Sequence, residues 1–280
     1  MEQSSSMQRP RMQTNPSNPD VLDVNVDDWV ELAKQYPSLL AYLAGFDTLD
    51  EWQDDILNSD SNRILMLCAR QTGKSSIVAL LALHHALSQP EAMIMIISKT
   101  WPQAAETFRK IVNFYRRIPN PINANVDSAH RLELENGSRI ITLSGQRPDS
   151  IRGYSGVTLL IVDEASQVLE ESYDVARPML AVSNGRIVLL STPHGRSGFF
   201  YDAWRDLKDK NIEGWHGIEV NWQDCPRLTP EFIKEEQRKY PQWYFNQEFC
   251  NSFEEGNQSI INPEAIRESF VDRPGRDLKF

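Results

Sequence analysis

Three short polar stretches in this chain each follow a run of apolar residues with the length of a buried strand. They are Lys74-Ser75, Asp163-Glu164 and Ser191-Thr192-Pro193. Side chains of these types bind phosphate, hold a divalent cation and move protons. Open α/β sheets place their ligands at the carboxyl ends of the strands. We therefore expect Lys74, Glu164 and Thr192 to converge on one triphosphate.

The first stretch predicts a loop that binds polyphosphate. A strand is expected at 64–68, a polar turn at 69–73, and a helix from 74 to 87 that Pro90 ends. Backbone N–H groups and the positive end of a helix attract phosphate at such a turn. Lys74 would reach the β- and γ-phosphates, and the Ser75 hydroxyl would ligate Mg²⁺. The residues expected around the nucleotide are Cys68, Ala69, Arg70, Gln71, Thr72, Gly73, Lys74 and Ser75, with Cys68 where the usual motif has glycine.

The second stretch predicts two functional carboxylates. The apolar residues 159–162 run directly into Asp163 and Glu164, so a buried strand delivers both acids at its carboxyl end. Asp163 is suited to hold Mg²⁺, directly or through water, as the partner of Ser75. Glu164 would orient and deprotonate the water that attacks the γ-phosphate. The alternative is a pair that only caps a helix expected at 166–180, but capping does not require a buried strand before it.

The third stretch ends the strand predicted at 186–190. Hydroxyl groups at a strand end, here those of Ser191 and Thr192, can hydrogen-bond the γ-phosphate or the attacking water and so sense hydrolysis. The alternative is an ordinary polar turn.

A glutamine, Gln53, stands ten residues before the first predicted strand. Its amide can present both a donor and an acceptor to the Watson–Crick edge of adenine. The alternative is a solvated glutamine on a helix, and the nearby phosphate loop favours the adenine contact.

The composition is that of an ordinary globular protein, with 40% hydrophobic and 24% charged residues in a chain of 280. No apolar run approaches the ~20 residues of a membrane span, and the first residues lack the apolar core of a secretory signal. Three widely spaced cysteines, without metal-ligand spacing, favour a reducing compartment. The net charge of −10 is concentrated between Asp20 and Asp60, so any DNA contact should be a local patch.

Further elements can be placed from the apolar pattern. Helical packing is expected at 26–46 with a break near Pro37, followed by a strand at 92–98 and a helix at 103–117. Strands at 131–134 and 139–144, split by Asn136-Gly137, are expected to form a hairpin or a pair of adjacent strands. The segment 109–152 has eight basic residues and four acidic ones. A solvated helical face accounts for Arg116 and Arg117, and the aromatics after Gly214 are expected to pack in the core or at an interface.

The motifs CARQTGKS, LLIVDEA and LLSTPHG, in that order, resemble those of the ATPase domain of tailed-phage large terminases, the motors that package viral DNA. The resemblance runs from about Trp52 to Phe253. Members of that family often lack the first glycine of the loop, as this chain does at Cys68. The segment 245–249, followed by Phe253, resembles the close of the family's ATPase domain.

The resemblance implies roles for further residues. Gln53 corresponds to the family's adenine-contacting glutamine, and Ser191-Thr192-Pro193 to its coupling motif. Arg152 resembles an arginine that family members offer to the ATP of the neighbouring subunit, while Arg70 would position phosphate or act in cis. An arginine that stabilises the transition state contributes about 10³ to 10⁵ in rate. The implied ligands are ATP and Mg²⁺.

The resemblance also implies partners and a setting. It predicts translocation of double-stranded DNA into a procapsid, contact with the portal and the small terminase subunit, a homo-oligomeric ring when docked, no membrane, and the cytoplasm of the infected host. The expected fold is an α/β P-loop NTPase of the additional-strand (ASCE) type, with a mostly parallel sheet flanked by helices and the 186–190 strand between those that carry Lys74 and Asp163. We expect a disordered tail at 1–20, the ATPase domain at 21–253, and at 254–280 a linker toward a nuclease domain absent from this chain.

Two other functions compete with this interpretation. A superfamily 2 helicase or translocase has similar motifs but needs a second motor domain, for which the length after Phe253 is too short. A nucleotide-binding assembly module that hydrolyses nothing would not need Glu164.

Overall fold

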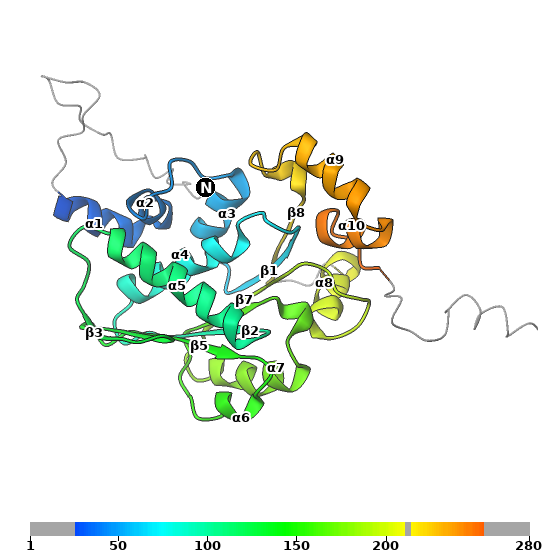
Figure 1. Cartoon of the computed structure of the whole chain (residues 1–280). Helices are drawn as coiled ribbons and strands as arrows, with labels where there is room; N and C mark the ends of the chain where they lie inside the picture. Colours follow the sequence, from blue (N-terminus) through cyan, green and yellow to red (C-terminus); the bar gives the residue numbers. More distant parts are fainter. Residues whose placement is uncertain (1–25, 211–213, 255–280) are drawn as a thin grey trace, which may run out of the picture.

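The computed structural model describes residues 26–210 and 214–254 (Figure 1). The predicted tail at 1–20 and all but the first residue of the predicted linker at 254–280 lie outside the described residues. Within the described part, no helix is long and apolar enough to cross a membrane.

The centre of the fold is an eight-stranded sheet with the order β3-β4-β5-β2-β6-β7-β1-β8. The strands are β1 Arg63–Cys68, β2 Met93–Ser98, β3 Ala124–Asp127, β4 Arg131–Leu134, β5 Arg139–Ser144, β6 Leu159–Asp163, β7 Arg186–Ser191 and β8 His216–Val220. The six strands from β5 to β8 in this order run parallel, while β3 and β4 add an antiparallel edge. Strand β7 lies between β6 and β1, which confirms the predicted strand order.

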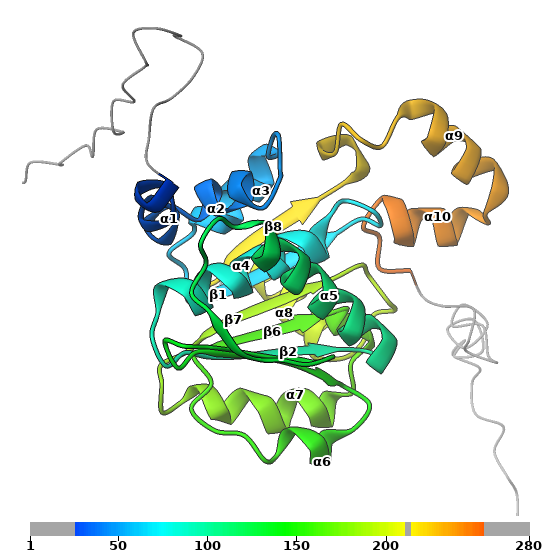
Figure 2. The same ribbon diagram turned by 60° about the vertical axis from the view of Figure 1, so that its left-hand side comes forward.

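Helices cover both faces of the sheet (Figure 2). They are α1 Val26–Gln35, α2 Pro37–Leu43, α3 Glu51–Asn58, α4 Lys74–Ser88, α5 Trp101–Arg117, α6 Pro148–Ile151, α7 Glu170–Ala176, α8 Phe199–Lys210, α9 Pro230–Lys239 and α10 Gln242–Phe249. One face carries α4 and α5 with the N-terminal helices, and the other carries α7 and α8.

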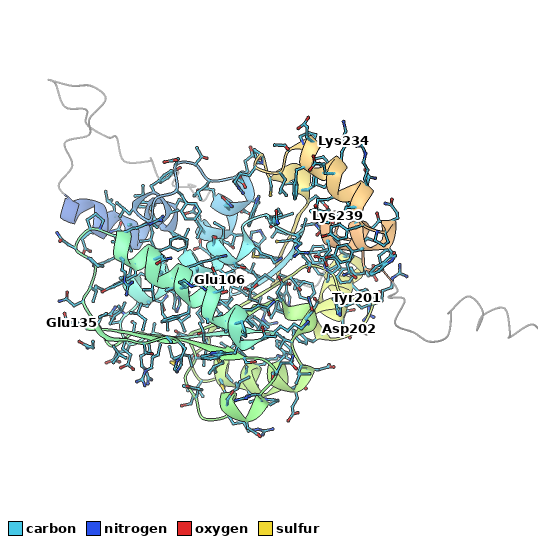
Figure 3. All side chains as sticks on the ribbon, in the orientation of Figure 1. Glu106, Glu135, Tyr201, Asp202, Lys234 and Lys239 are labelled. Carbon is cyan, nitrogen blue, oxygen red and sulfur yellow. The ribbon has the colours of Figure 1, made fainter. Side chains whose placement is uncertain are left out.

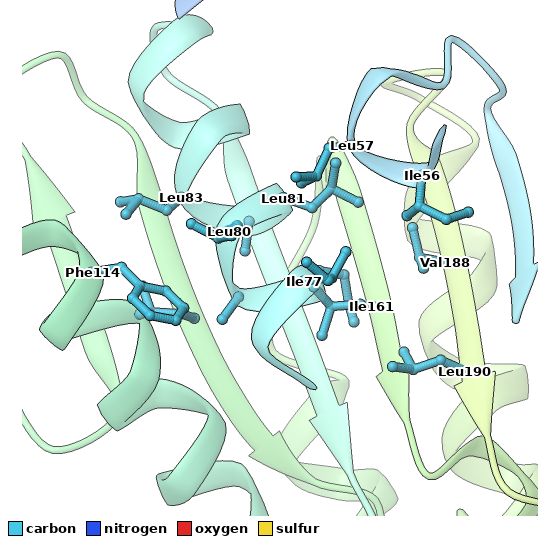
Figure 4. Close-up of a cluster of buried hydrophobic side chains, with 14 of the residues drawn as sticks. Ile56, Leu57, Ile77, Leu80, Leu81, Leu83, Phe114, Ile161, Val188 and Leu190 are labelled. Atoms are coloured by element: carbon cyan, nitrogen blue, oxygen red, sulfur yellow. The ribbon is translucent and has the colours of Figure 1, made fainter. Parts of the chain in front are cut away.

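Helix α4 forms the centre of the larger core (Figure 4). Ile77, Leu80 and Leu83 are fully buried against strand residues such as Ile161 and Val188. Helix α4 lies between the sheet and the helices α1, α2, α3 and α5, so little of its surface is exposed. For this reason its residues are apolar on nearly every side. The first residue of this helix, Lys74, is thereby fixed at the carboxyl edge of the sheet.

Side chains along β6 alternate between the two faces of the sheet, and this alternation determines the face to which Asp163, its last residue, points. Leu159 and Ile161 face the core around α4 and α5, while Leu160 and Val162 face the core around α7 and α8. Successive strand residues point to opposite faces. Asp163 therefore points to the same side of the sheet as Lys74.

The helix predicted at 166–180 is wrong as one element. A 3₁₀ turn at Ala165–Gln167 is followed by extended backbone at Val168 and Leu169, then by α7 and a second 3₁₀ turn at Arg177–Leu180. Pro178 lacks the N–H that would continue α7, and its ring disfavours a regular α-helix beyond it. The hairpin of β4 and β5 and the break at Pro37 are confirmed.

Candidate active site

The phosphate loop is a tight turn between β1 and α4. Gln71 and Gly73 both have left-handed backbone, with φ of 62° and 94°, a conformation that glycine adopts without strain. Thr72 is buried and donates its hydroxyl hydrogen to the Ala69 carbonyl at 3.1 Å. Cys68 is the last residue of β1, and burial raises the pKa of its thiol to about 12. Cys68 therefore packs in the core, and the turn itself begins at Ala69.

The chain after β7 holds the loop in place. The Ala69 N–H donates to the Val220 carbonyl at 2.8 Å, and the Arg70 N–H donates to the Glu248 carbonyl at 2.7 Å. The Arg70 guanidinium also donates to the Tyr244 hydroxyl at 2.9 Å. Both backbone amides at the start of the turn are thus committed to protein carbonyls, and Arg70 is oriented by α10.

Lys74 forms an ion pair with Glu164. Its Nζ lies 3.1 Å from Glu164 Oε1, and the lysine is buried while the glutamate is partly exposed. Burial acts to lower the pKa of Lys74, but the carboxylates of Glu164 and Asp163 outweigh it, so the pKa is raised. The lysine is therefore a fixed positive charge at the edge of the sheet.

Asp163 is buried beside this pair. The Thr107 hydroxyl of α5 donates to its Oδ2 at 3.2 Å, and the Glu164 N–H donates to its Oδ1 at 3.0 Å. Burial and the neighbouring Glu164 raise its pKa, against the attraction of Lys74 and the hydroxyls of Thr107 and Ser75. The Ser75 hydroxyl is among the groups that favour the charged form of Asp163, so it lies near this carboxylate.

The donor set around Asp163 suits Mg²⁺. Protein sites for Mg²⁺ commonly supply one or two carboxylates and leave the other positions to phosphate and water. Asp163 and the Ser75 hydroxyl fit that pattern. Ser98, paired with Asp163 in the register of β2 and β6, is buried and its hydroxyl has no hydrogen-bond partner among the described residues. Within the described part, no group of three or more His, Cys, Asp or Glu side chains is arranged so that it could hold a metal ion.

Glu164 has a non-glycine left-handed backbone, with φ 53° and ψ 45°. Such strain persists where surrounding contacts hold it, and it is common at functional sites. The Ser191 hydroxyl approaches Glu164 Oε2 at 3.4 Å and contacts the Ser166 hydroxyl at 2.7 Å. The turn after β6 is therefore connected to the end of β7.

The remaining residues of the third stretch are buried. The Ser166 hydroxyl donates to the Thr192 carbonyl at 2.9 Å, and the side chains of Thr192 and Pro193 are buried next to it. Ser191 and Thr192 thus form a fixed connection to the turn of Glu164 rather than an exposed polar turn.

Gln53 is buried beside the loop, so the alternative of a solvated glutamine is wrong. Its Oε1 accepts from the Asp50 N–H at 3.0 Å, which caps α3. A Cβ atom on Gly73 would lie 3.3 Å from Gln53 Nε2, so the amide donor faces the loop. The structure therefore places the amide next to the nucleotide loop.

Arg152 lies away from this cluster. It follows α6, is exposed, and pairs with Glu171 at 3.3 Å and Asp149 at 3.5 Å. The sites expected at Arg70 and Arg152 are thus separated: the first belongs to the loop and the second to the surface.

Two residues of the site were not predicted. Arg227 makes a two-pronged ion pair with Asp50, at 3.0 and 2.6 Å, and donates to the Thr72 carbonyl at 3.1 Å. No local pattern marks it, because its partners are more than 150 positions away. Thr107 had a signal: it lies among Ala104, Phe108 and Ile111 on the buried face of α5, where a hydroxyl requires a partner.

The sheet order, the loop between β1 and α4, and the acids at the end of β6 define a P-loop NTPase of the additional-strand type. The family described as "Terminase large subunit, T4likevirus-type, N-terminal" matches residues 65–268. The chain belongs to that family.

Known relatives agree with this assignment. The large terminase subunit of Thermus virus P23-45 is 25% identical over 241 residues, which cover 74% of this chain and 49% of that protein. The chain spans about half the length of the curated relatives it matches.

Solved structures share the fold. The large terminase ATPase domain of Thermus phage P74-26 aligns with a TM-score of 0.66 and 24% identity, covering 76% of this chain and 96% of that domain. The large terminase of another thermophilic bacteriophage, solved in complex with ADP, aligns with a TM-score of 0.63 and 13% identity, covering 73% and 54% of the two chains.

Proposed function

We propose that this chain hydrolyses ATP with Mg²⁺ and thereby drives double-stranded DNA into a procapsid. The observation that carries the proposal is the cluster of Lys74, Glu164 and Asp163 beside the phosphate loop, with Lys74 Nζ 3.1 Å from Glu164 Oε1. The relatives named as large terminase subunits support the packaging role, and the related structure solved with ADP supports the nucleotide.

The chain's own residues provide the chemistry of phosphate transfer. Lys74 and the loop amides neutralise the phosphate oxygens, and the Gln53 amide faces the adenine. Ser75 and Asp163 would hold Mg²⁺, which would offset the negative charge of the phosphates when bound.

Glu164 is the general base of the proposed reaction. It accepts a proton from water as the water oxygen bonds to the γ-phosphorus and the bond to the bridging oxygen breaks, which yields ADP and phosphate. Ser191 orients the glutamate. Because Ser191, Thr192 and the turn after β6 are connected, loss of the γ-phosphate would be transmitted to β7 through this connection.

The proposed setting is a ring of subunits. Arg152, exposed on one subunit, would reach the ATP of the next and stabilise its transition state, while Arg70 positions phosphate in its own subunit. The partners would be DNA, the portal of the procapsid and the small terminase subunit, in the cytoplasm of the infected host. No membrane is involved in this proposal.

Replacing Glu164 tests the proposal. Glu164→Gln removes the base but keeps the shape of the side chain, so phosphate release should fall about 100-fold or more. Binding of a fluorescent ATP analogue should persist. Glu170→Gln, at an exposed position on α7, is the matched control and should release phosphate at the wild-type rate.

Two results of this assay would contradict the proposal. Equal phosphate release by Glu164→Gln and wild type would show that Glu164 is not the base. Nucleotide binding without phosphate release by the wild-type chain, even with duplex DNA and Mg²⁺, would instead favour an assembly module.

A further inference from the structure

A second concave site lies on the same edge of the sheet as the phosphate loop, beyond the ends of β2 and β5. It is a groove of about 540 Å³, and its lining includes Trp101, His130, Ser144, Gln146, Arg147 and Ser150. None of these side chains is used by the proposed hydrolysis. The groove is therefore available for another ligand.

The groove presents a cation beside an exposed aromatic ring. Trp101 is 45% exposed, and its ring meets that of His130 edge-on at 5.3 Å. Arg147 is exposed, and no ion pair or hydrogen bond of its guanidinium occurs within the described residues. By contrast, Arg131 and Arg152 are paired with carboxylates. The free guanidinium is suited to an anion, and the ring to a sugar or base.

The groove also lies in the basic part of an acidic chain. The segment 109–152 has eight basic and four acidic residues, a net charge of +4, whereas the whole chain carries −10. A polyanion would be repelled by most of the surface and attracted here. The hydroxyl of Ser144 and the side-chain amide of Gln146 add uncharged donors for phosphate oxygens, while the Ser150 hydroxyl donates to the Arg147 carbonyl at 2.7 Å and holds the Arg147 backbone.

We propose that this groove binds the sugar–phosphate backbone of DNA. Arg147 contacts a phosphate, Trp101 packs against deoxyribose, and the side chains of Ser144 and Gln146 fix the strand by hydrogen bonds. This inference rests on the proposed function, because it assigns the surface through which that motor would hold its DNA.

The groove has a short structural connection to the hydrolytic site. Helix α5 begins in it at Trp101, and Thr107 of the same helix contacts Asp163, about 9 Å further along the axis. In addition, Lys99 Nζ donates to Gln167 Oε1 at 2.6 Å, joining the start of α5 to the turn after Glu164. DNA in the groove would therefore contact the helix that supports the metal-binding carboxylate.

Fluorescence anisotropy with a labelled DNA duplex, over a range of KCl concentrations, tests the groove in the full chain. Arg147→Gln should weaken binding and lower the slope of log K against log salt by about 1, since one phosphate contact is lost. Trp101→Ala should weaken binding about 5-fold or more with the slope unchanged. Arg147→Lys should keep the wild-type slope.

The matched control is Arg238→Gln, next to Lys239 (labelled in Figure 3) on α9, a helix that lies away from β5 (Figure 1). It is also exposed and should bind duplex as the wild type does. Because Trp101, Arg147 and Arg238 are exposed, thermal melting should show the same fold for all variants.

Two results overturn the inference. Wild-type affinity and slope in both Arg147→Gln and Trp101→Ala would exclude the groove as a DNA site. If these two variants bind DNA as the wild type does but self-associate less than the wild type in sedimentation, the groove receives a second copy of the chain instead. If the wild-type chain binds no duplex, the proposed packaging function itself fails.

Discussion

The hydrogen bond from Thr107 fixes the orientation of Asp163, the most buried carboxylate of the site. Asp163 cannot turn freely, because its Oδ2 accepts from Thr107 and its Oδ1 from the Glu164 N–H. Groups that orient a metal ligand commonly contribute 10- to 100-fold to metal affinity. If Asp163 holds Mg²⁺ as proposed, Thr107 positions that ligand, and its effect should appear in the dependence of nucleotide binding on Mg²⁺.

Removing that hydroxyl gives a specific prediction. Thr107→Val should raise the Mg²⁺ concentration that half-saturates binding of a fluorescent ADP analogue by about 10-fold. Nucleotide binding without Mg²⁺ should change little, because Lys74 and the loop are untouched. Thr107→Ser restores the hydroxyl and should recover most of the effect. An unchanged Mg²⁺ midpoint in Thr107→Val would exclude this role.

At the scale of elements, three distant segments meet at Arg227. It joins the start of α3 at Asp50 to the loop at Thr72, from the connection between β8 and α9. The guanidinium donates one hydrogen bond to each oxygen of the Asp50 carboxylate. The ammonium group of a lysine cannot form this bidentate pair. The Arg227 side chain is 52% exposed and that of Asp50 is 9% exposed, so we expect the pair to affect the order of the loop more than global stability.

Arg227→Lys should therefore weaken ATP binding while the unfolding free energy changes by about 1 kcal/mol or less. Hydrogen exchange at the loop amides, residues 69–75, should become faster. Arg205→Lys is the control, because Arg205 also pairs with carboxylates, those of Asp202 and Asp206, but lies on α8. Loop exchange as slow as in the wild type would show that the arginine does not hold the loop.

The sequence was most informative where an apolar run ended in polar residues. Such runs predicted β1, β6 and β7 and the meeting of Lys74 with Glu164, whereas the order of these strands was expected from the resemblance to the terminase family. The short edge strand β8 escaped prediction because its exposed residues alternate with half-buried ones and include Gly217. Val220, Arg227 and Glu248 contact the loop from positions about 150 or more residues later in the chain. Such contacts depend on the tertiary fold, and no local sequence pattern predicts them.

At the scale of the whole molecule, the role proposed for Arg152 would make an isolated subunit differ from an assembly in its rate of hydrolysis. Its guanidinium is exposed and its partners are surface carboxylates. If it serves a neighbour, each subunit alone lacks one catalytic charge, and hydrolysis should rise more steeply than linearly with protein concentration. A linear dependence would indicate that each subunit is complete.

Mixing two inactive variants distinguishes these cases. Lys74→Ala cannot bind phosphate but still offers Arg152, while Arg152→Ala keeps an intact loop. Phosphate release by the mixture should exceed the sum of the two separate rates, because a mixed ring has complete sites. An additive result would place the arginine within its own subunit or outside the reaction.

The carbonyls that fix the start of the loop, those of Val220 and Glu248, come about 150 and 180 positions after Ala69 and Arg70. During synthesis on the ribosome, every residue of the loop is therefore made long before Val220 and Glu248, whose carbonyls hold the loop in place. The newly made protein would become able to bind ATP only near the end of this domain's synthesis, so an incomplete chain would not consume nucleotide.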